Sequence, residues 1–144
     1  MLRVVQRAER NDRRIVAWTE HELKWVNTLR ADDPDLVRRF KARFSNAKRI
    51  AERWRNRLHG RDTPADGKLS SYLRLIGYPV PGEAVGGDVG QTIRDVRARF
   101  ERGLPPTFGQ AERWRRVVEH NRHDCIGMRR ICLLATRELE ATTT

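Results

Sequence analysis

The chain is poor in cysteine and has no long apolar stretch. Only two of its 144 residues are cysteines, and no apolar run approaches the length of a membrane span. A transmembrane helix needs about 20 predominantly apolar residues in a row, so membrane insertion is not expected. The segment from Met1 to Arg14 carries too many charges for a secretory signal peptide. These absences predict a cytoplasmic protein with no membrane partner.

The two cysteines, Cys125 and Cys132, are not expected to form a disulfide bond with each other. Their seven-residue spacing places both on one face of a predicted helix. Seven helical residues advance the chain by about 10 Å, which exceeds the reach of a disulfide. We therefore expect two buried, reduced thiols, as is usual in a reducing compartment.

Lysine and acidic residues are scarce beside arginine. Thirty basic residues face 19 acidic ones, for a net charge of +11, and only four of the 30 are lysine. Between positions 38 and 61, ten Lys or Arg face one acid, Glu52, so the local charge is +9. Guanidinium groups bind phosphate bidentately, which favours nucleic acid as the partner, with a solvated helix face as the alternative. The candidate contacts are Arg38, Arg39, Arg43, Arg49, Arg53 and Arg57.

Helical periodicity dominates the pattern of apolar residues. The apolar run Ile15–Trp18 is too short for a helix and is the one predicted strand. The sequence thus indicates an α-rich α/β fold in a single domain over 1–141, followed by a disordered tail over 142–144. Helices are predicted over 2–12, 20–30, 35–58, 68–77, 90–102, 108–120 and 122–140.

The helix over 35–58 is the longest that the periodicity predicts. Its apolar residues recur every three or four positions, so one side should pack on a core and the basic side should face solvent. That continuous stripe consists of Phe40, Phe44, Ala47, Ala51, Trp54 and Leu58.

Short local signals mark where elements begin and end. Thr19 is predicted to cap the helix over 20–30, with Glu22 completing a capping box. Gly77 is predicted to end the helix over 68–77. Glycine and proline predict loops over 59–67 and 79–90.

A polar cluster stands at the head of the predicted last helix. His120 and Asp124 are four residues apart, so a helix brings them to the same face. A carboxylate with a protonatable neighbour one turn away can hold a metal ion and orient a water molecule. The simpler reading is a polar helix start in which the pair only caps the helix.

Two segments of the chain carry a family resemblance. The order His120-Asn121-x-x-Asp124 resembles the third acidic motif of the DEDD 3′→5′ exonucleases, in the YprB-type branch of the ribonuclease-H-like superfamily. His120 stands where that branch has tyrosine. Trp18-Thr19-Glu20-His21-Glu22, directly after the predicted strand, resembles the second acidic motif. The segments 68–73 and 76–78 resemble the stretch that leads to the third motif.

The resemblance spans Leu2 to Leu139 and implies a fold, a metal and a reaction. It implies the C-terminal portion of a ribonuclease-H-like fold, with one or two short strands and about six helices. Glu22 and Asp124 would be metal-binding carboxylates for Mg²⁺ or Mn²⁺, and His120 would act on the attacking water. Convergence on a metal site requires their carboxylates to lie within roughly 10 Å of each other.

The chain departs from the family pattern at its N-terminal end. These exonucleases take their first two carboxylates from an Asp-x-Glu on the first strand of the sheet. The nearest acids here, Glu9, Asp12 and Glu20, form no such strand-borne pair. We therefore expect a partial exonuclease-like domain that acts on or binds nucleic acid and is inactive alone. An upstream segment or a partner would supply the missing strands, unless the chain is a truncated remnant.

Other functions are open on the same residues. The chain could be a non-catalytic basic helical module that binds nucleic acid, or a helical protein whose apolar stripes bind a partner. A zinc site could combine His120, His123 and Asp124 with His21 or a cysteine, although no paired-cysteine or His-x-x-x-His spacing supports it. The doublet His123-Asp124 also resembles HD-type phosphohydrolases, whose further ligands are not evident.

Overall fold

The computed structural model describes residues 1–60, 66–79 and 89–142, and the chain there is rich in helix. The predicted α-rich α/β class fits this structure. The predicted loops over 59–67 and 79–90 fall largely outside the described residues. The elements are α1 (Leu2–Arg10), β1 (Ile15–Ala17), α2 (His21–Leu29), α3 (Pro34–Arg43), β2 (Phe44–Asn46), α4 (Ala47–Leu58), α5 (Leu69–Leu75), α6 (Val89–Glu101) and α7 (Phe108–Ala141).

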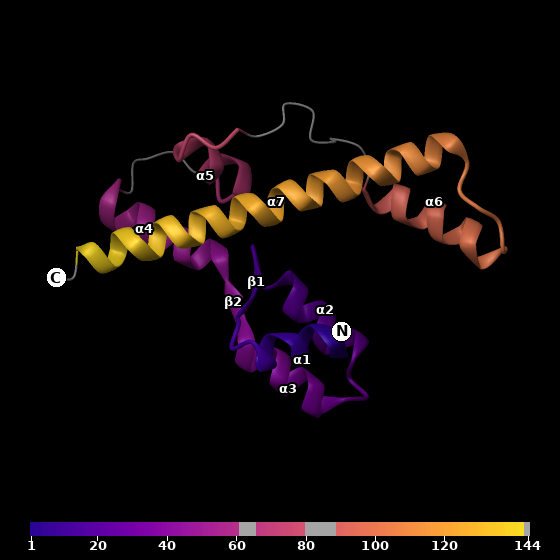
Figure 1. Ribbon diagram of the computed structural model, residues 1–144, viewed down its shortest axis with the longest axis horizontal. Helices are drawn as coiled ribbons and strands as arrows, with labels where there is room; N and C mark the ends of the chain where they lie inside the picture. Colours follow the sequence, from indigo (N-terminus) through magenta and orange to yellow (C-terminus); the bar gives the residue numbers. More distant parts are fainter. Residues whose placement is uncertain (61–65, 80–88, 143–144) are drawn as a thin grey trace.

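The long helix α7 is the axis on which the other helices of the C-terminal part are arranged. It has 34 residues and is therefore about 50 Å long. Figure 1 shows α4 and α5 along the C-terminal half of α7 and α6 along its N-terminal half. Thr107 and Gln110 form a capping box that satisfies the first backbone N–H groups of α7.

The prediction of two separate helices over 108–120 and 122–140 is wrong, because α7 runs through both without a break. Neither glycine nor proline lies between 110 and 126, so nothing in the backbone interrupts the hydrogen-bond ladder. His120 and Asp124 consequently lie in the middle of a helix and not at its head.

The prediction of one continuous helix over 35–58 is also wrong. Phe44 has extended backbone angles, φ −70° and ψ 140°, and the chain forms β2 before it re-enters a helix. Asn46 then caps α4 by accepting a hydrogen bond from the backbone N–H of Arg49 at 3.1 Å. Arg14 donates to the carbonyl oxygens of Ala42 at 3.0 Å and Phe44 at 2.7 Å, so acceptors freed by the break are satisfied.

The strand β2 pairs in parallel with β1, in the register Ile15 with Phe44 and Ala17 with Asn46. The predicted strand over 15–18 is thus confirmed as β1. Helices α2 and α3 form the crossover between the two strands. They enclose a first apolar cluster with α1, made of Val5, Val26, Leu36 and Phe40.

A second apolar cluster lies between α4, α5 and α7. Trp18, which follows β1, packs on the edge of this cluster, with its ring centroid 5.4 Å from that of Tyr72. Its indole N–H also donates to the carbonyl oxygen of Gly67 at 3.0 Å. Trp18 therefore joins the strand region to the α7 region. The fully buried members of this cluster are Ala51, Trp54, Tyr72, Leu73, Ile131 and Ala135.

The predicted starts and ends of the helices agree with the structure in part. Helix α2 begins at His21 with Glu20 as its N-cap residue, so the predicted capping box of Thr19 and Glu22 is wrong. The Thr19 hydroxyl instead accepts a hydrogen bond from the His21 N–H at 3.2 Å. Gly77 has φ +64° and ends α5 as predicted, with its N–H donating to the carbonyl of Arg74. Of the predicted tail, Thr142 follows α7 as its C-cap residue, and 143–144 lie outside the described residues.

No helix in the described ranges is apolar over a length sufficient to cross a membrane.

Gly127 lies where α7 meets α5, and a side chain there should destabilise the fold. A methyl group at Gly127 would come within 2.8 Å of both δ-carbons of Leu73, which is buried. We expect Gly127→Ala to lower the free energy of unfolding by about 1–2 kcal/mol, because overpacking costs more than the gain in helix propensity. Chemical denaturation followed by circular dichroism measures this change.

Gly109, near the start of α7, is the matched control, because a methyl group there meets nothing within 4 Å. Gly109→Ala should leave stability unchanged or raise it by less than about 1 kcal/mol. In addition, Gly127→Ala should be tolerated better in a Leu73→Ala background, where the cavity accepts the added methyl. A stabilised Gly127→Ala variant would contradict the packing of α5 against α7.

Candidate nucleic-acid interface

The six arginines predicted to contact nucleic acid separate into two groups with different surroundings. Three lie on α3 and are paired with acids of the same chain. The other three lie on α4 and are exposed to solvent on one face. The break at β2 makes this division, because it ends the single basic helix that the sequence predicted.

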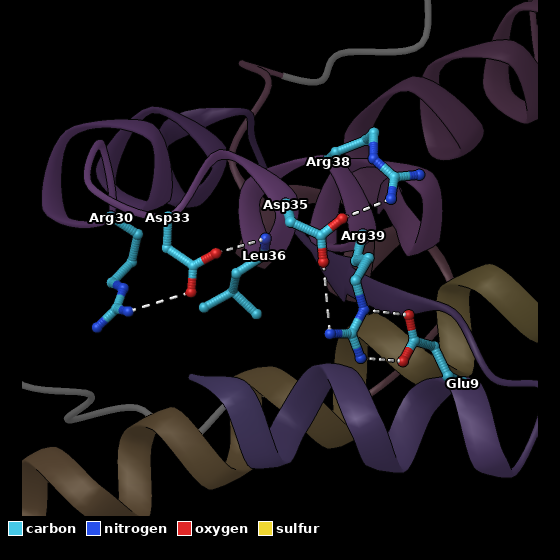
Figure 2. Close-up of polar contacts among 7 residues, drawn as sticks. All are labelled: Glu9, Arg30, Asp33, Asp35, Leu36, Arg38 and Arg39. Atoms are coloured by element: carbon cyan, nitrogen blue, oxygen red, sulfur yellow. Dashed lines mark hydrogen bonds and ion pairs between the residues drawn. The ribbon is translucent and has the colours of Figure 1, made fainter.

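Arg39 holds α3 against α1. Its Nε and Nη2 groups donate to the two carboxylate oxygens of Glu9 at 2.9 and 2.6 Å, and its Nη1 lies 3.8 Å from Asp35 (Figure 2). Both partners are half-buried, with 29% of the Arg39 and 33% of the Glu9 side chain exposed. The hydrogen bonds from Arg39 hold the pKa of Glu9 below its usual value. This bidentate contact orients Arg39 toward the protein.

The other two arginines of α3 also contact carboxylates. Arg38 donates to Asp35 at 2.5 Å on the same helix (Figure 2). Arg43 donates to Asp12 at 2.5 Å, and this hydrogen bond lowers the pKa of Asp12. Much of the charge on α3 is therefore balanced within the protein. Arg38 remains 75% exposed and could exchange its partner for a phosphate.

Helix α4 presents the second group as a regular stripe. Arg49, Arg53 and Arg57 are one turn apart and exposed, while Ala51 and Trp54 on the opposite face are buried. A spacing of four residues corresponds to about 6 Å along the axis, so the stripe is about 12 Å long. We call these three side chains the α4 arginine stripe.

The α4 arginine stripe is only lightly engaged by the rest of the chain. Arg49 lies 2.8 Å from Glu20, and its side chain is still 73% exposed. Arg57 donates to the carbonyl oxygen of Thr142 at 3.2 Å. Arg53 has neither a hydrogen-bond nor an ion-pair partner among the residues that the structure describes. Exposed ion pairs such as that of Arg49 contribute little and break at low cost.

A shallow groove runs between the stripe and the end of α7. Its volume is about 480 Å³, and Arg53 and Arg57 form one side of it. The other side is formed by Thr136, Leu139 and Glu140 of α7, and Ile50 of α4 also lines the groove. Asn56 is exposed next to Arg57, and its side-chain oxygen accepts hydrogen bonds from Arg55 at 3.2 and 2.8 Å.

The residues predicted to bind a metal are found on two different helices. The Nε2 atom of His120 lies 3.3 Å from a carboxylate oxygen of Asp124, so the predicted pair is formed within α7. Glu22 is exposed in the first turn of α2, where its carboxylate accepts a hydrogen bond from the Thr19 hydroxyl at 3.5 Å.

Within residues 1–60, 66–79 and 89–142, no three or more His, Cys, Asp or Glu side chains are grouped so that they could hold a metal ion. The assignment of Glu22 and Asp124 as metal ligands therefore stays a prediction from the sequence pattern.

The two thiols differ in their surroundings. Cys132 is half-buried, and burial raises the pKa of its thiol. Cys125 is exposed, so the prediction that both thiols are buried is wrong for this residue.

Comparison with family models, curated proteins and solved structures gave no match. What the chain binds is therefore inferred from its own side chains.

The contact between Glu9 and Arg39 should make the stability depend on pH in the acid range. Because the pKa of Glu9 is lowered in the folded chain, its stabilising contribution is present above the unfolded pKa and is lost as pH falls through the folded pKa. We expect the thermal midpoint of the wild type to fall more steeply than that of Glu9→Gln between about pH 5 and pH 3. Circular dichroism melts at half-unit pH steps measure both slopes.

Arg39→Met is the companion variant, since Arg39 is the main cause of the lowered pKa of Glu9. It should remove the same component of the acid dependence as Glu9→Gln. Parallel curves for the wild type and both variants would show that the contact contributes no pH-dependent stability.

Proposed function

We propose that the chain is a non-enzymatic module that binds nucleic acid through the α4 arginine stripe. The observation that carries this proposal is the alignment of Arg49, Arg53 and Arg57 on the exposed face of a helix whose other face is buried. Each guanidinium group can donate two parallel hydrogen bonds to phosphate oxygens. Three such groups in a row can follow a phosphate backbone along the axis of α4.

The position of α4 supports this proposal, because the helix is already fixed before a ligand arrives. Trp54 is 2% exposed, and its indole N–H donates to Glu138 of α7 at 2.6 Å. A helix held in this way loses little backbone entropy on binding, so more of the contact energy appears as affinity.

The overall charge of +11 supports the same partner. A phosphate backbone is surrounded by condensed counterions, and their release makes binding strong at low salt and steeply salt-dependent. The stripe offers phosphate contacts and no aromatic platform, because Trp54 is buried. Binding with little sequence preference follows from this chemistry, for DNA or for RNA. A cytoplasmic location, which the two free thiols favour, belongs to the same proposal.

Replacing Arg49, Arg53 and Arg57 together with glutamine should weaken binding and flatten its salt dependence. If each residue neutralises one phosphate, the slope of log K against log salt concentration should become less steep by roughly 3. Fluorescence anisotropy with labelled single-stranded and double-stranded oligonucleotides between about 50 and 200 mM salt measures this slope.

A triple variant of α1 provides the matched control, because Arg3, Arg7 and Arg10 are also exposed and spaced along one helix. Their replacement by glutamine removes the same charge at another place. Its effect on binding should be clearly smaller than that of the α4 variant. Equal effects would mean that the net charge, and not the α4 arginine stripe, governs the affinity.

A second candidate function is that of a partial ribonuclease-H-like 3′→5′ exonuclease domain. Two observations favour it: the 3.3 Å contact between His120 and Asp124, and the position of Glu22 in the first helical turn after β1. In this proposal Glu22 and Asp124 would contribute carboxylate oxygens to Mg²⁺ or Mn²⁺, which would supply charge stabilisation to phosphodiester hydrolysis. Further carboxylates would come from an upstream segment or a partner.

The chain by itself should show little or no nuclease activity in Mg²⁺ or Mn²⁺. Two-metal hydrolysis requires more carboxylates than Glu22 and Asp124 provide, and their loss removes several kcal/mol of transition-state stabilisation. The assay uses labelled single-stranded DNA and RNA with each metal, and Asp124→Ala as the comparison. Robust cleavage by the wild type that disappears in Asp124→Ala would establish a complete active site in this chain.

A further inference from the structure

The hairpin of α6 and the N-terminal half of α7 has almost no core of its own. Helix α6 buries only Thr92 and Val96, and no residue of α7 from 108 to 126 is buried. In Figure 1 this helix pair extends away from the other described helices and strands. Several large apolar side chains of the hairpin are exposed instead: Ile93, Phe100, Leu104, Phe108, Trp114 and Val118.

Three of these side chains, Ile93, Phe100 and Trp114, line an apolar hollow. The hollow has a volume of about 460 Å³ and lies between α6 and α7, with Ile93, Phe100 and Trp114 among its walls. Its polar lining consists of one base and one acid, Arg97 and Glu101. Exposure of several large apolar side chains to water is unfavourable, and exposed apolar patches are typical of protein interfaces.

We propose that a second copy of the chain covers this surface, so that two α6–α7 hairpins pack together in a homodimer. The exposed apolar surface area of the hairpin supports such a dimer. Phe100 is 63% exposed, Phe108 89% and Trp114 41%, which leaves on the order of 400 Å² of aromatic surface in water. A standard stable interface buries roughly 800 Å² per partner, and the aromatic side chains of the hairpin would supply about half of that area.

Charge opposes self-association less at this surface than at the segment 38–61. Residues 89–120 contain seven arginines and four acids, for a net charge of +3, whereas the segment 38–61 carries +9. Two copies of a chain with a total charge of +11 repel each other less when they meet through the hairpin than through the segment 38–61.

The rim of the hollow is self-complementary. Arg97 and Glu101 are four residues apart on α6, and their charged atoms lie 2.7 Å apart. In a two-fold dimer whose axis passes near Phe100, Arg97 of one copy faces Glu101 of the second copy, and the same contact is repeated across the axis. The two Phe100 side chains then lie at the centre of the interface, where an aromatic residue contributes most.

Sedimentation equilibrium of the full chain, with reductant and without nucleic acid, tests the proposal. The wild type should be a dimer, and Phe100→Glu should raise the dimer dissociation constant by about 30-fold or more. Leu29→Glu is the matched control, because Leu29 on α2 is 64% exposed and Phe100 is 63% exposed. The control should dimerise as the wild type does. A monomeric wild type, or an equal loss in both variants, would overturn the proposal.

A charge-swap experiment tests the register of the interface. Arg97→Glu alone and Glu101→Arg alone each place like charges across the two-fold axis. The homodimer of each single variant should therefore dissociate into monomers. A mixture of the two variants should form a heterodimer, because every cross-axis contact then joins opposite charges. A contact within one helix cannot produce this recovery, so a mixture that stays monomeric would refute the register.

The experiment is independent of nucleic-acid binding. The triple glutamine variant of the α4 arginine stripe should still form the dimer, so failure of either proposal is recognised separately. Association that appears only when an oligonucleotide is added would overturn the homodimer, because two chains bound through α4 to one oligonucleotide account for it.

Discussion

The burial of one face of α4 against the C-terminal half of α7 is the contact on which the rest of the structure depends. Ala51 and Trp54 enter a cluster with Ile131 and Ala135, and these four side chains leave almost no surface exposed. Because the contact fixes the rotation of α4 about its own axis, it decides which side chains face solvent. The α4 arginine stripe is the consequence, since charged side chains opposite the buried face of a helix keep their hydration.

A second constraint is that arginine can serve two roles in this segment. It can stabilise the fold through an ion pair, or it can stay exposed and available to a ligand. Arg39 is half-buried and binds Glu9 in bidentate fashion, whereas Arg53 has no partner in the described part of the chain. Both are arginines of one basic segment, and only their surroundings differ. Carboxylates of α1 and of the turn after it, which lie about 30 positions earlier, neutralise α3 and leave α4 basic. The +9 of the segment therefore overstates the charge that a polyanion would meet.

The continuity of α7 connects two regions with opposite packing. Its C-terminal half is packed against α4 and α5, and Gly127 allows α5 to approach closely. Its N-terminal half lies along α6 and leaves Phe108 and Trp114 exposed to solvent. A single long helix can carry both because its backbone hydrogen bonds are internal and require no tertiary partner. Helix α6 and helix α4 thus pack along different halves of the same helix, α7.

The sequence by itself determined the local elements. The strand at Ile15–Ala17, the helix at Val89–Glu101 and the end of α5 at Gly77 follow from apolar spacing and glycine, which act over a few residues. The continuity of α7 was also encoded locally, since no helix breaker lies between 110 and 126, although polar residues there suggested a boundary. The pairing of His120 with Asp124 belongs to the same class, because it depends only on a four-residue helical spacing.

Only the tertiary structure decided where the helix over 35–58 breaks and which arginines are free. Phe44 continues the helical apolar period and stacks on Phe40, so no local signal excludes it from a helix. It becomes extended because β1 and Arg14, about 30 residues earlier, provide the hydrogen bonds that a helix would otherwise provide. Ion pairs such as that of Arg39 with Glu9 also join distant positions. Apolar periodicity predicts which face of a helix is buried, but not which other elements the helix contacts. The six candidate arginines could therefore be predicted from the sequence, whereas their separation into paired and exposed groups required the tertiary structure.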